Sequence, residues 1–179
     1  MKMKIMRNLI LISLLFSFAV NSFGQKSETM TVKLYFLNEK FDPNLLDCTK
    51  VHPVTRQIPK TKAIARAALD ELFKGVTPEE SSKGYVSFSA EETKGILKSI
   101  KIKNKAAYIN FNKVVYEQLG SATTSCGGGF FTSVEKTLFQ FPTIKKIFYA
   151  IEGNPADFYE WVQVGECPKE LKNCSGKDF

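Results

Sequence analysis

Apolar and polar residues alternate along several short segments of this 179-residue chain, which is the pattern of half-buried β-strands. In the first segment, Val32, Leu34 and Phe36 alternate with Lys33 and Tyr35. The segments predicted as strands are 31–37, 51–59, 84–89, 96–102, 106–111, 144–151 and 159–164.

Two features of these strands predict how they pair. Segment 51–59 is expected at a sheet edge, because Pro53 has no N–H group to donate to a neighbouring strand. Segments 96–102 and 106–111 are expected to form a hairpin, because only the short polar turn at 103–105 separates them.

Apolar residues at intervals of three and four predict two main helices. The first covers 60–74, and Gly75 is a natural end for it. The second covers 130–141 and stops before Pro142. The apolar residues of the two helices are Ile64, Ala65, Ala68, Leu69, Leu72 and Phe73, then Phe131, Val134, Leu138 and Phe141.

The order of these elements predicts an α+β fold. We expect a single domain with a mostly antiparallel sheet and two main helices packed on one face. A short helix over 113–119, capped by Asn112 and ended by Gly120, is expected between the hairpin and the second main helix.

The first 24 residues have the pattern of a secretory signal peptide. Lys2, Lys4 and Arg7 precede an apolar run over 9–20, which is short for a membrane span, and cleavage is expected before Gln25. An uncleaved anchor helix is the alternative. We therefore expect export to the periplasm or the cell exterior, with no stable membrane span after cleavage.

The charge of the exported chain gives little indication of a partner. Without residues 1–24 the chain has 22 basic and 18 acidic residues, a net charge of +4. The lysines are dispersed along the sequence, and no basic run contains interleaved aromatic residues. We expect no nucleic-acid partner.

An exported chain with four cysteines is expected to form two disulfides. Four cysteines allow three pairings. We favour Cys48 with Cys126, because each lies in a segment that needs anchoring. Cys167 would then pair with Cys174, which is close to it in sequence.

The stretch from Cys126 through three glycines to Gly129 stands directly before the second main helix and allows three interpretations. The thiol could be a nucleophile at a helix N-terminus, with His52, the single histidine, as its base. The glycine N–H groups could hold a phosphate, although no G-K-[ST] motif follows. We favour the third, a disulfide that pins a sharp glycine turn into the helix, with His52 as a surface or loop residue.

Metal and acid–base chemistry have weaker support. One histidine and no C-x-x-C motif predict no zinc site, and Asp42 and Asp47 lack the spacing of a calcium loop. The glutamate pairs at 79–80 and 91–92 are expected to be solvated turn charges. We therefore expect no metal, no cofactor and no catalytic residue.

The chain resembles the GerMN domain of bacterial sporulation and spore-germination proteins over residues 31–153. The resemblance rests on the segments VKLYFLN, HPVTRQIP, AALDELFKGVTPEE, AAYINFN and SVEKTLFQFPTIKKI, in this order. GerMN domains look like the ring-building modules of secretion and sporulation machines. The resemblance therefore implies a ring-building-motif-like α+β fold and carries over no catalytic residue.

This resemblance implies a non-enzymatic protein-interaction or assembly module of the bacterial cell envelope or exterior. The expected partner is an unknown envelope or extracellular protein, or a second copy of the chain. Arg56, where the family pattern often has a basic residue, either contacts the partner or solvates a sheet edge. The alternative function is a secreted thiol-dependent enzyme that uses Cys126 with His52.

These expectations divide the chain into three parts. Residues 1–24 are the signal peptide and residues 25–154 are the GerMN-like domain. Residues 155–179 contain the last predicted strand and a tail with two cysteines.

Overall fold

A computed structural model describes residues 28–120 and 127–179 of the chain. The described strands are β1 (Thr29–Asn38), β2 (His52–Pro59), β3 (Tyr85–Val86), β4 (Leu97–Lys103), β5 (Ala106–Phe111) and β6 (Lys146–Ile151). The α-helices are α2 (Ile64–Leu72), α3 (Pro78–Ser82), α4 (Val115–Gln118), α5 (Gly127–Phe139) and α6 (Pro155–Trp161). Two short 3₁₀ turns cover Pro43–Leu45 and Lys172–Cys174.

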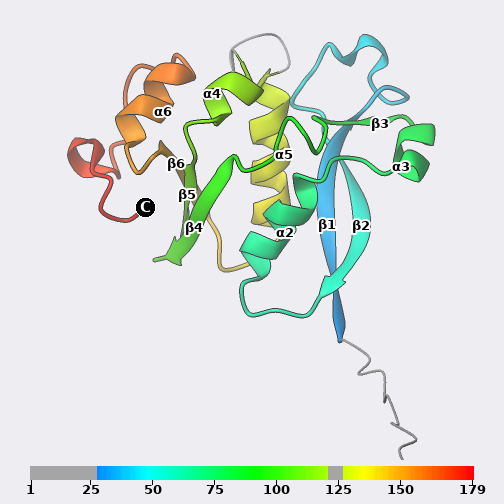
Figure 1. Cartoon of the computed structure of the whole chain (residues 1–179), viewed down its shortest axis with the longest axis horizontal. Helices are drawn as coiled ribbons and strands as arrows, with labels where there is room; N and C mark the ends of the chain where they lie inside the picture. The colour runs from blue at the N-terminus through cyan, green and yellow to red at the C-terminus, as the bar shows by residue number, and fades with distance from the viewer. Residues whose placement is uncertain (1–27, 121–126) are drawn as a thin grey trace, which may run out of the picture.

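The described strands form two three-stranded sheets, ordered β2-β1-β3 and β4-β5-β6. Helices α2 and α5 lie between the two sheets, and α6 packs beside β6, where its Phe158 ring stacks on Tyr149 and meets Phe131 of α5 (Figure 1). Both α2 and α5 contact β1 and each other. The layer between the sheets includes Leu69 and Leu138, which have no exposed surface.

The first sheet has one buried face and one exposed face. On β1, Val32, Leu34 and Phe36 are buried, as the alternating pattern predicts. Helix α5 also covers the edge of β1 that β2 leaves open. The side-chain amide of Gln140 accepts from Lys33 N at 2.9 Å and donates to Lys33 O at 2.7 Å, as a neighbouring strand would.

The second sheet is covered on both faces. All six residues of β5 are buried, which is typical of a central strand with a parallel neighbour. Strand β4 pairs with β5 through a two-residue turn, and β6 runs parallel to β5. Asn104 and Lys105 form the turn with φ angles of 50° and 61°, values that suit the twist of a tight hairpin.

The C-terminal segment packs on the outer face of this second sheet. Leu171 and Phe179 are buried there, and the Phe179 ring meets the edge of Tyr108 at 5.4 Å. A disulfide joins Cys167 to Cys174, with their Cα atoms 5.6 Å apart. The tail is therefore part of the same apolar core as the rest of the described chain.

The α+β class and most elements predicted from the sequence are confirmed. The expected sheet is divided into two smaller sheets, with the two main helices between them. The predicted strand 84–89 shortens to Tyr85–Val86, because the chain then leaves the sheet and Phe88 packs on Phe130. The short helix predicted over 113–119 forms over Val115–Gln118, without a side-chain cap.

The strand predicted at 159–164 is wrong, because these residues begin within helix α6. The side chain of Asn154 accepts from Ala156 N at 3.1 Å, and Pro155 occupies the first turn, which are both signals of a helix start. Phe158 and Tyr159 are buried neighbours on this helix. The predicted signal peptide at 1–24 lies outside the described residues.

Candidate functional site

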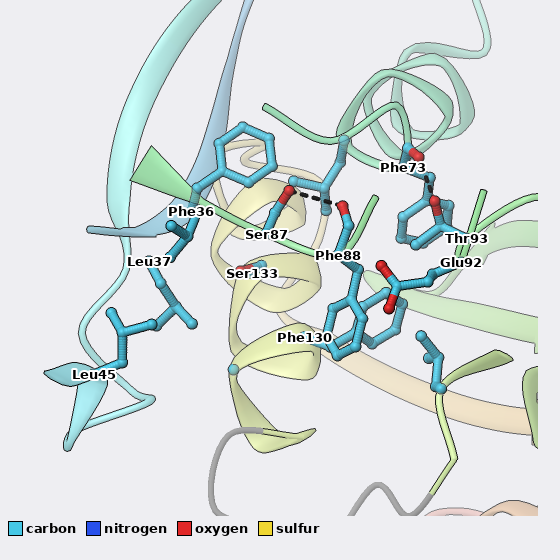
Figure 2. Close-up of a pocket in the computed structure, with 14 residues that line it drawn as sticks. Phe36, Leu37, Leu45, Phe73, Ser87, Phe88, Glu92, Thr93, Phe130 and Ser133 are labelled. Carbon is cyan, nitrogen blue, oxygen red and sulfur yellow. Dashed lines mark hydrogen bonds between the residues drawn. The ribbon is translucent and has the colours of Figure 1, made fainter. Parts of the chain in front are cut away.

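An apolar cleft of about 430 Å³ opens at the end of the molecule where β1, β3 and the start of α5 meet. Figure 2 shows its walls, which come from separate parts of the chain. They are the end of β1, the loop after it, the end of α2, β3 with the segment that follows it, Leu119 after α4, and the first turns of α5. Phe36, Phe73, Phe88 and Phe130 supply most of the aromatic lining.

The aromatic wall is held by ring–ring contacts. Phe73 stacks on Phe130 with centroids 5.4 Å apart, and Phe88 meets the edge of Phe130 at 5.6 Å. Phe73 and Phe130 are buried, whereas Phe88 is half-buried. Such pairs fix ring orientation, so the cleft has a defined apolar surface rather than a loose gap.

The loop that follows β1 forms a rim beside the cleft and exposes large apolar side chains. Phe41 is 64% exposed and Leu46 is 82% exposed, while Leu45 between them lines the cleft. We call residues 41–46 the rim loop. Two exposed apolar side chains in one loop, beside an apolar cleft, together form a candidate contact surface.

The rim loop has a strained but well-anchored backbone. Asn44 and Leu45 have φ angles of 69° and 50°, a region that a branched residue such as leucine seldom adopts. Asp42 Oδ2 accepts from Asp47 N at 2.7 Å, and Asp47 Oδ1 accepts from Thr49 N at 3.0 Å. The Asp42 carboxylate therefore closes the loop, in which two of the apolar side chains remain exposed.

The polar groups at the cleft mainly support the surrounding backbone. Glu92 and Ser89 exchange hydrogen bonds between side chain and backbone, at 2.8 Å and 3.2 Å. The hydrogen bond from Ser89 N lowers the pKa of Glu92, so this carboxyl group at the edge of the cleft stays ionised. The Thr93 hydroxyl donates to the carbonyl oxygen of Phe73. Figure 2 shows the Glu92 side chain directed toward the aromatic wall.

Arg56 lies behind the cleft, held inside the protein. Its guanidinium donates to both carboxylate oxygens of Glu80, at 3.0 Å and 2.5 Å, to Glu71 Oε1 at 3.2 Å and to Gly75 O at 2.7 Å. It also lies 5.6 Å from the ring centroid of Phe36. Burial alone would lower the pKa of Arg56, but the hydrogen bonds to Glu80 and Glu71 outweigh it and raise that pKa.

Arg56 therefore ties β2 to the end of α2 and to the start of α3. Glu80 also closes a capping box with Thr77 at the N-terminus of α3. Only 10% of the Arg56 side chain is exposed. Contact of Arg56 with a partner stays a prediction, and little of its side-chain surface is accessible for such a contact. Glu80 is not the solvated turn charge that the sequence predicted.

His52 is the first residue of β2 and is half-buried, so it lies in a strand and not in a loop. Its ring lies 4.5 Å from the ring of Phe41, and its Nε2 atom is buried without a hydrogen-bond partner. Cys126 lies outside the described residues. The pairing of His52 with a Cys126 nucleophile therefore stays a prediction.

Cys48 is buried beside the first turn of α5. A Cβ atom placed on Gly129 would lie 3.6 Å from the Cys48 Cβ atom and 3.2 Å from Leu37 Cδ1. The close approach of helix and loop therefore favours glycine at this position. Glycines 127–129 form the start of helix α5, so the turn predicted at these residues is wrong. The predicted disulfide between Cys48 and Cys126 lies partly outside the described residues and stays a prediction.

Sequence analysis missed a half-buried acid next to a buried phenol. The Tyr149 hydroxyl lies 3.3 Å from Glu135 Oε1, between α5 and β6. Burial raises the pKa of Glu135 and, more strongly, that of Tyr149, and it raises the pKa of Tyr159 to about 12. The pair is far apart in sequence, so no spacing pattern could have indicated it. It joins helix to sheet and lies away from the cleft lining.

Metal binding and membrane crossing find no support in the part of the chain that the structure describes. Among residues 28–120 and 127–179, no three His, Cys, Asp or Glu side chains gather as metal ligands would. None of the helices in these ranges combines the length and apolar character needed to cross a bilayer.

The chain belongs to the sporulation and spore germination family called Germane, which matches residues 33–157. The family description names a process and no reaction. The predicted GerMN resemblance is therefore confirmed, and the match extends from β1 into α6. No functionally curated protein matches the chain.

Two solved structures are similar to this chain. The tandem GerMN domains of the sporulation protein GerM from Bacillus subtilis share 24% identity, with a TM-score of 0.48, over 70% of this chain and 39% of that chain. The first GerMN domain of the same protein shares 19% identity, with a TM-score of 0.43, over 69% of this chain and 84% of that chain. This chain thus spans about two fifths of the tandem structure.

Proposed function

We propose that this protein is an exported, non-enzymatic interaction module of the bacterial cell envelope or exterior. In this proposal it binds an apolar segment of a partner protein in the aromatic cleft and on the rim loop. The single observation that carries the proposal is the placement of two highly exposed apolar side chains, Phe41 and Leu46, beside an apolar cleft.

The chemistry of the cleft favours binding over catalysis. Its lining is mainly aromatic and aliphatic, and its polar groups at Glu92 and Thr93 are engaged with nearby backbone. Among the described residues that line it, no histidine or cysteine provides a nucleophile or a general base. A preformed apolar cleft with few polar groups is typical of a recognition site for apolar side chains.

Two features support the proposed export. The first 24 residues have the three-part pattern of a signal peptide. The tail contains a Cys167–Cys174 disulfide, and disulfides persist mainly in oxidising compartments outside the cytoplasm. The family's link to sporulation and spore germination makes a bacterial envelope process the proposed setting.

The proposal is tested by the size of the native complex in envelope fractions. We expect the double variant Phe41→Asn/Leu46→Asn to remain folded but to run as a smaller species than the wild type on a native gel. Val164→Asn is the matched control, because Val164 is 65% exposed and lies after α6, away from the cleft lining. A complex of unchanged size in the double variant would refute binding through the rim loop.

The alternative thiol enzyme needs a separate test. A disulfide-bonded Cys126 predicts no titratable thiol in the native, unreduced protein, whereas a nucleophilic Cys126 predicts at least one. Detection of a reactive thiol, mapped to Cys126 by peptide analysis, would favour the enzyme and contradict the proposed function.

A further inference from the structure

We propose that the end of the molecule opposite the cleft binds the surface of an anionic phospholipid bilayer. This goes beyond the proposed partner binding and uses a different surface. The surface, which we call the lysine end, is formed by the β4–β5 turn, the α5–β6 loop and the β2–α2 loop (Figure 1). Its basic residues are Lys60, Lys62, Lys101, Lys103, Lys105, Lys145 and Lys146.

The fold brings together lysines that are far apart in the sequence. The backbone N–H groups of Lys145 and Lys146 both donate to the carbonyl oxygen of Lys105, at 2.7 Å and 3.3 Å. Three exposed lysines from two separate segments are therefore neighbours at the hairpin turn. The lysines are dispersed along the sequence, but the β4–β5 turn and the α5–β6 loop bring these three together in space. The expectation of dispersed surface lysines is therefore wrong at this end.

Acidic side chains neutralise only part of the lysine end. Glu28 pairs with Lys60 at 2.7 Å, Asp178 with Lys103 at 2.5 Å, and Glu170 with Lys146 at 2.8 Å. Lys101 donates to the backbone oxygen of Phe179. Within the described chain, the remaining exposed lysines of this end form no ion pair. They are Lys62, Lys105 and Lys145.

Apolar side chains at the same end favour a bilayer over a nucleic acid. Ile102, between Lys101 and Lys103, is 44% exposed, and Phe139 at the end of α5 is 45% exposed. A bilayer interface accepts apolar side chains while its anionic headgroups attract nearby lysines. A phosphate backbone would leave the apolar groups without a partner.

The direction in which the chain enters the fold agrees with this orientation. Strand β1 begins at Thr29 at the lysine end, whereas β3 and the start of α5, which border the cleft, lie at the other end of the molecule (Figure 1). An uncleaved N-terminal anchor, the alternative to cleavage before Gln25, would therefore connect to the fold at this end. The charge distribution does not depend on this point. Binding in this orientation would leave the cleft facing away from the bilayer.

The test measures binding of the whole chain to vesicles of two compositions. One set contains only phosphatidylcholine, and the other contains phosphatidylcholine with about one third phosphatidylglycerol. Binding to the neutral set also reports any insertion of the apolar N-terminal run, so the difference between the sets isolates the charge effect. A lysine near an anionic membrane typically strengthens binding about fivefold.

The variant Lys105→Gln/Lys145→Gln is expected to weaken binding to the anionic vesicles on the order of 25-fold. The matched control is Lys83→Gln/Lys113→Gln, which removes the same charge near α3 and α4, at a distance from the lysine end (Figure 1). The control should bind nearly as well as the wild type. Salt should weaken wild-type binding, because ions screen exposed charges.

Three results would overturn the proposal. The first is equal wild-type binding to the neutral and anionic vesicles. The second is an equal loss in both double variants, which would mean that only net charge matters. The third is that Lys105→Gln/Lys145→Gln weakens binding to random duplex DNA but leaves binding to the anionic vesicles unchanged, which would mean that the lysine end binds nucleic acid. None of these results depends on whether the cleft binds a partner.

Discussion

The two sheets of this protein are covered to different extents. The second sheet is closed on both faces, by α2, α5 and Phe158 of α6 on one side and by the tail on the other, and every residue of β5 is buried. The first sheet has one exposed face, and the apolar cleft opens where its strands end. The comparison indicates that the second sheet mainly supplies stability, whereas the end of the first sheet supplies a surface for binding.

The largest expected effect comes from the layer that holds the two sheets together. Leu138→Ala and Leu69→Ala should each lower the free energy of unfolding by ~2–5 kcal/mol, because both side chains are fully buried. Chemical denaturation measures the change. An unchanged midpoint for both variants would mean that the helices do not form a common core with the sheets.

A comparable effect is expected behind the cleft. Arg56→Gln should destabilise the protein by about 3 kcal/mol, because it leaves the carboxylates of Glu80 and Glu71 without their buried partner. Arg56→Lys keeps the charge but loses the two-pronged contact with Glu80, so it should restore only part of the stability.

The same ion pair predicts a dependence on pH. Burial alone would raise the pKa of Glu80, but the hydrogen bonds from Arg56 and Thr77 outweigh it and lower that pKa. A carboxyl group with a lowered pKa stabilises the fold above its unfolded pKa of about 4.3, and this contribution is lost as pH falls through the folded value. Wild-type stability should therefore drop below about pH 4 more steeply than that of Arg56→Gln. Parallel slopes would exclude this role for the pair.

A smaller effect is expected from the cover of the second sheet. Cys174→Ser removes the disulfide that closes a short loop in the tail, and loop entropy gives a loss of about 2 kcal/mol. Hydrogen exchange should accelerate in residues 165–179 more than in the first sheet. Uniform acceleration throughout the protein would show that the tail is essential to the whole core.

The smallest effect on stability is expected at the rim loop. Phe41→Asn and Leu46→Asn should change the free energy of unfolding by about 0.5 kcal/mol or less, because both side chains are largely exposed. Thermal unfolding measures the change. A loss above about 2 kcal/mol would show that the two residues support the fold, and would weaken their assignment to binding.

The sequence was most informative where local patterns decide the structure. Alternating residues predicted β1, and the short polar turn predicted the β4–β5 hairpin. Helical spacing predicted α2 and α5, and their ends differ from the predicted ones by only a few residues. The strand predicted at 159–164 is wrong because adjacent apolar residues fit both a strand and a short helix. The helix start signal at Asn154 and Pro155 decides between the two.

The candidate site was harder to predict, because it depends on contacts between distant segments. Arg56 was identified, but its three partners lie 15 to 24 residues away, and no spacing rule connects them. The rim loop did carry a signal, since Phe41 and Leu46 are apolar residues within a polar loop that contains Asp-Pro. The cleft itself appears only when β1, β3 and α5 are brought together.

The most direct test of the central claim is a photo-crosslinking amino acid placed at Leu46 in cells that produce the protein. The proposed interaction module predicts a discrete crosslinked product from Leu46, with the partner joined through an apolar segment. The same amino acid at Val164, which is similarly exposed, should give none. Equal crosslinking from the two positions, or none from Leu46 in the native envelope, would contradict partner binding at the rim of the cleft.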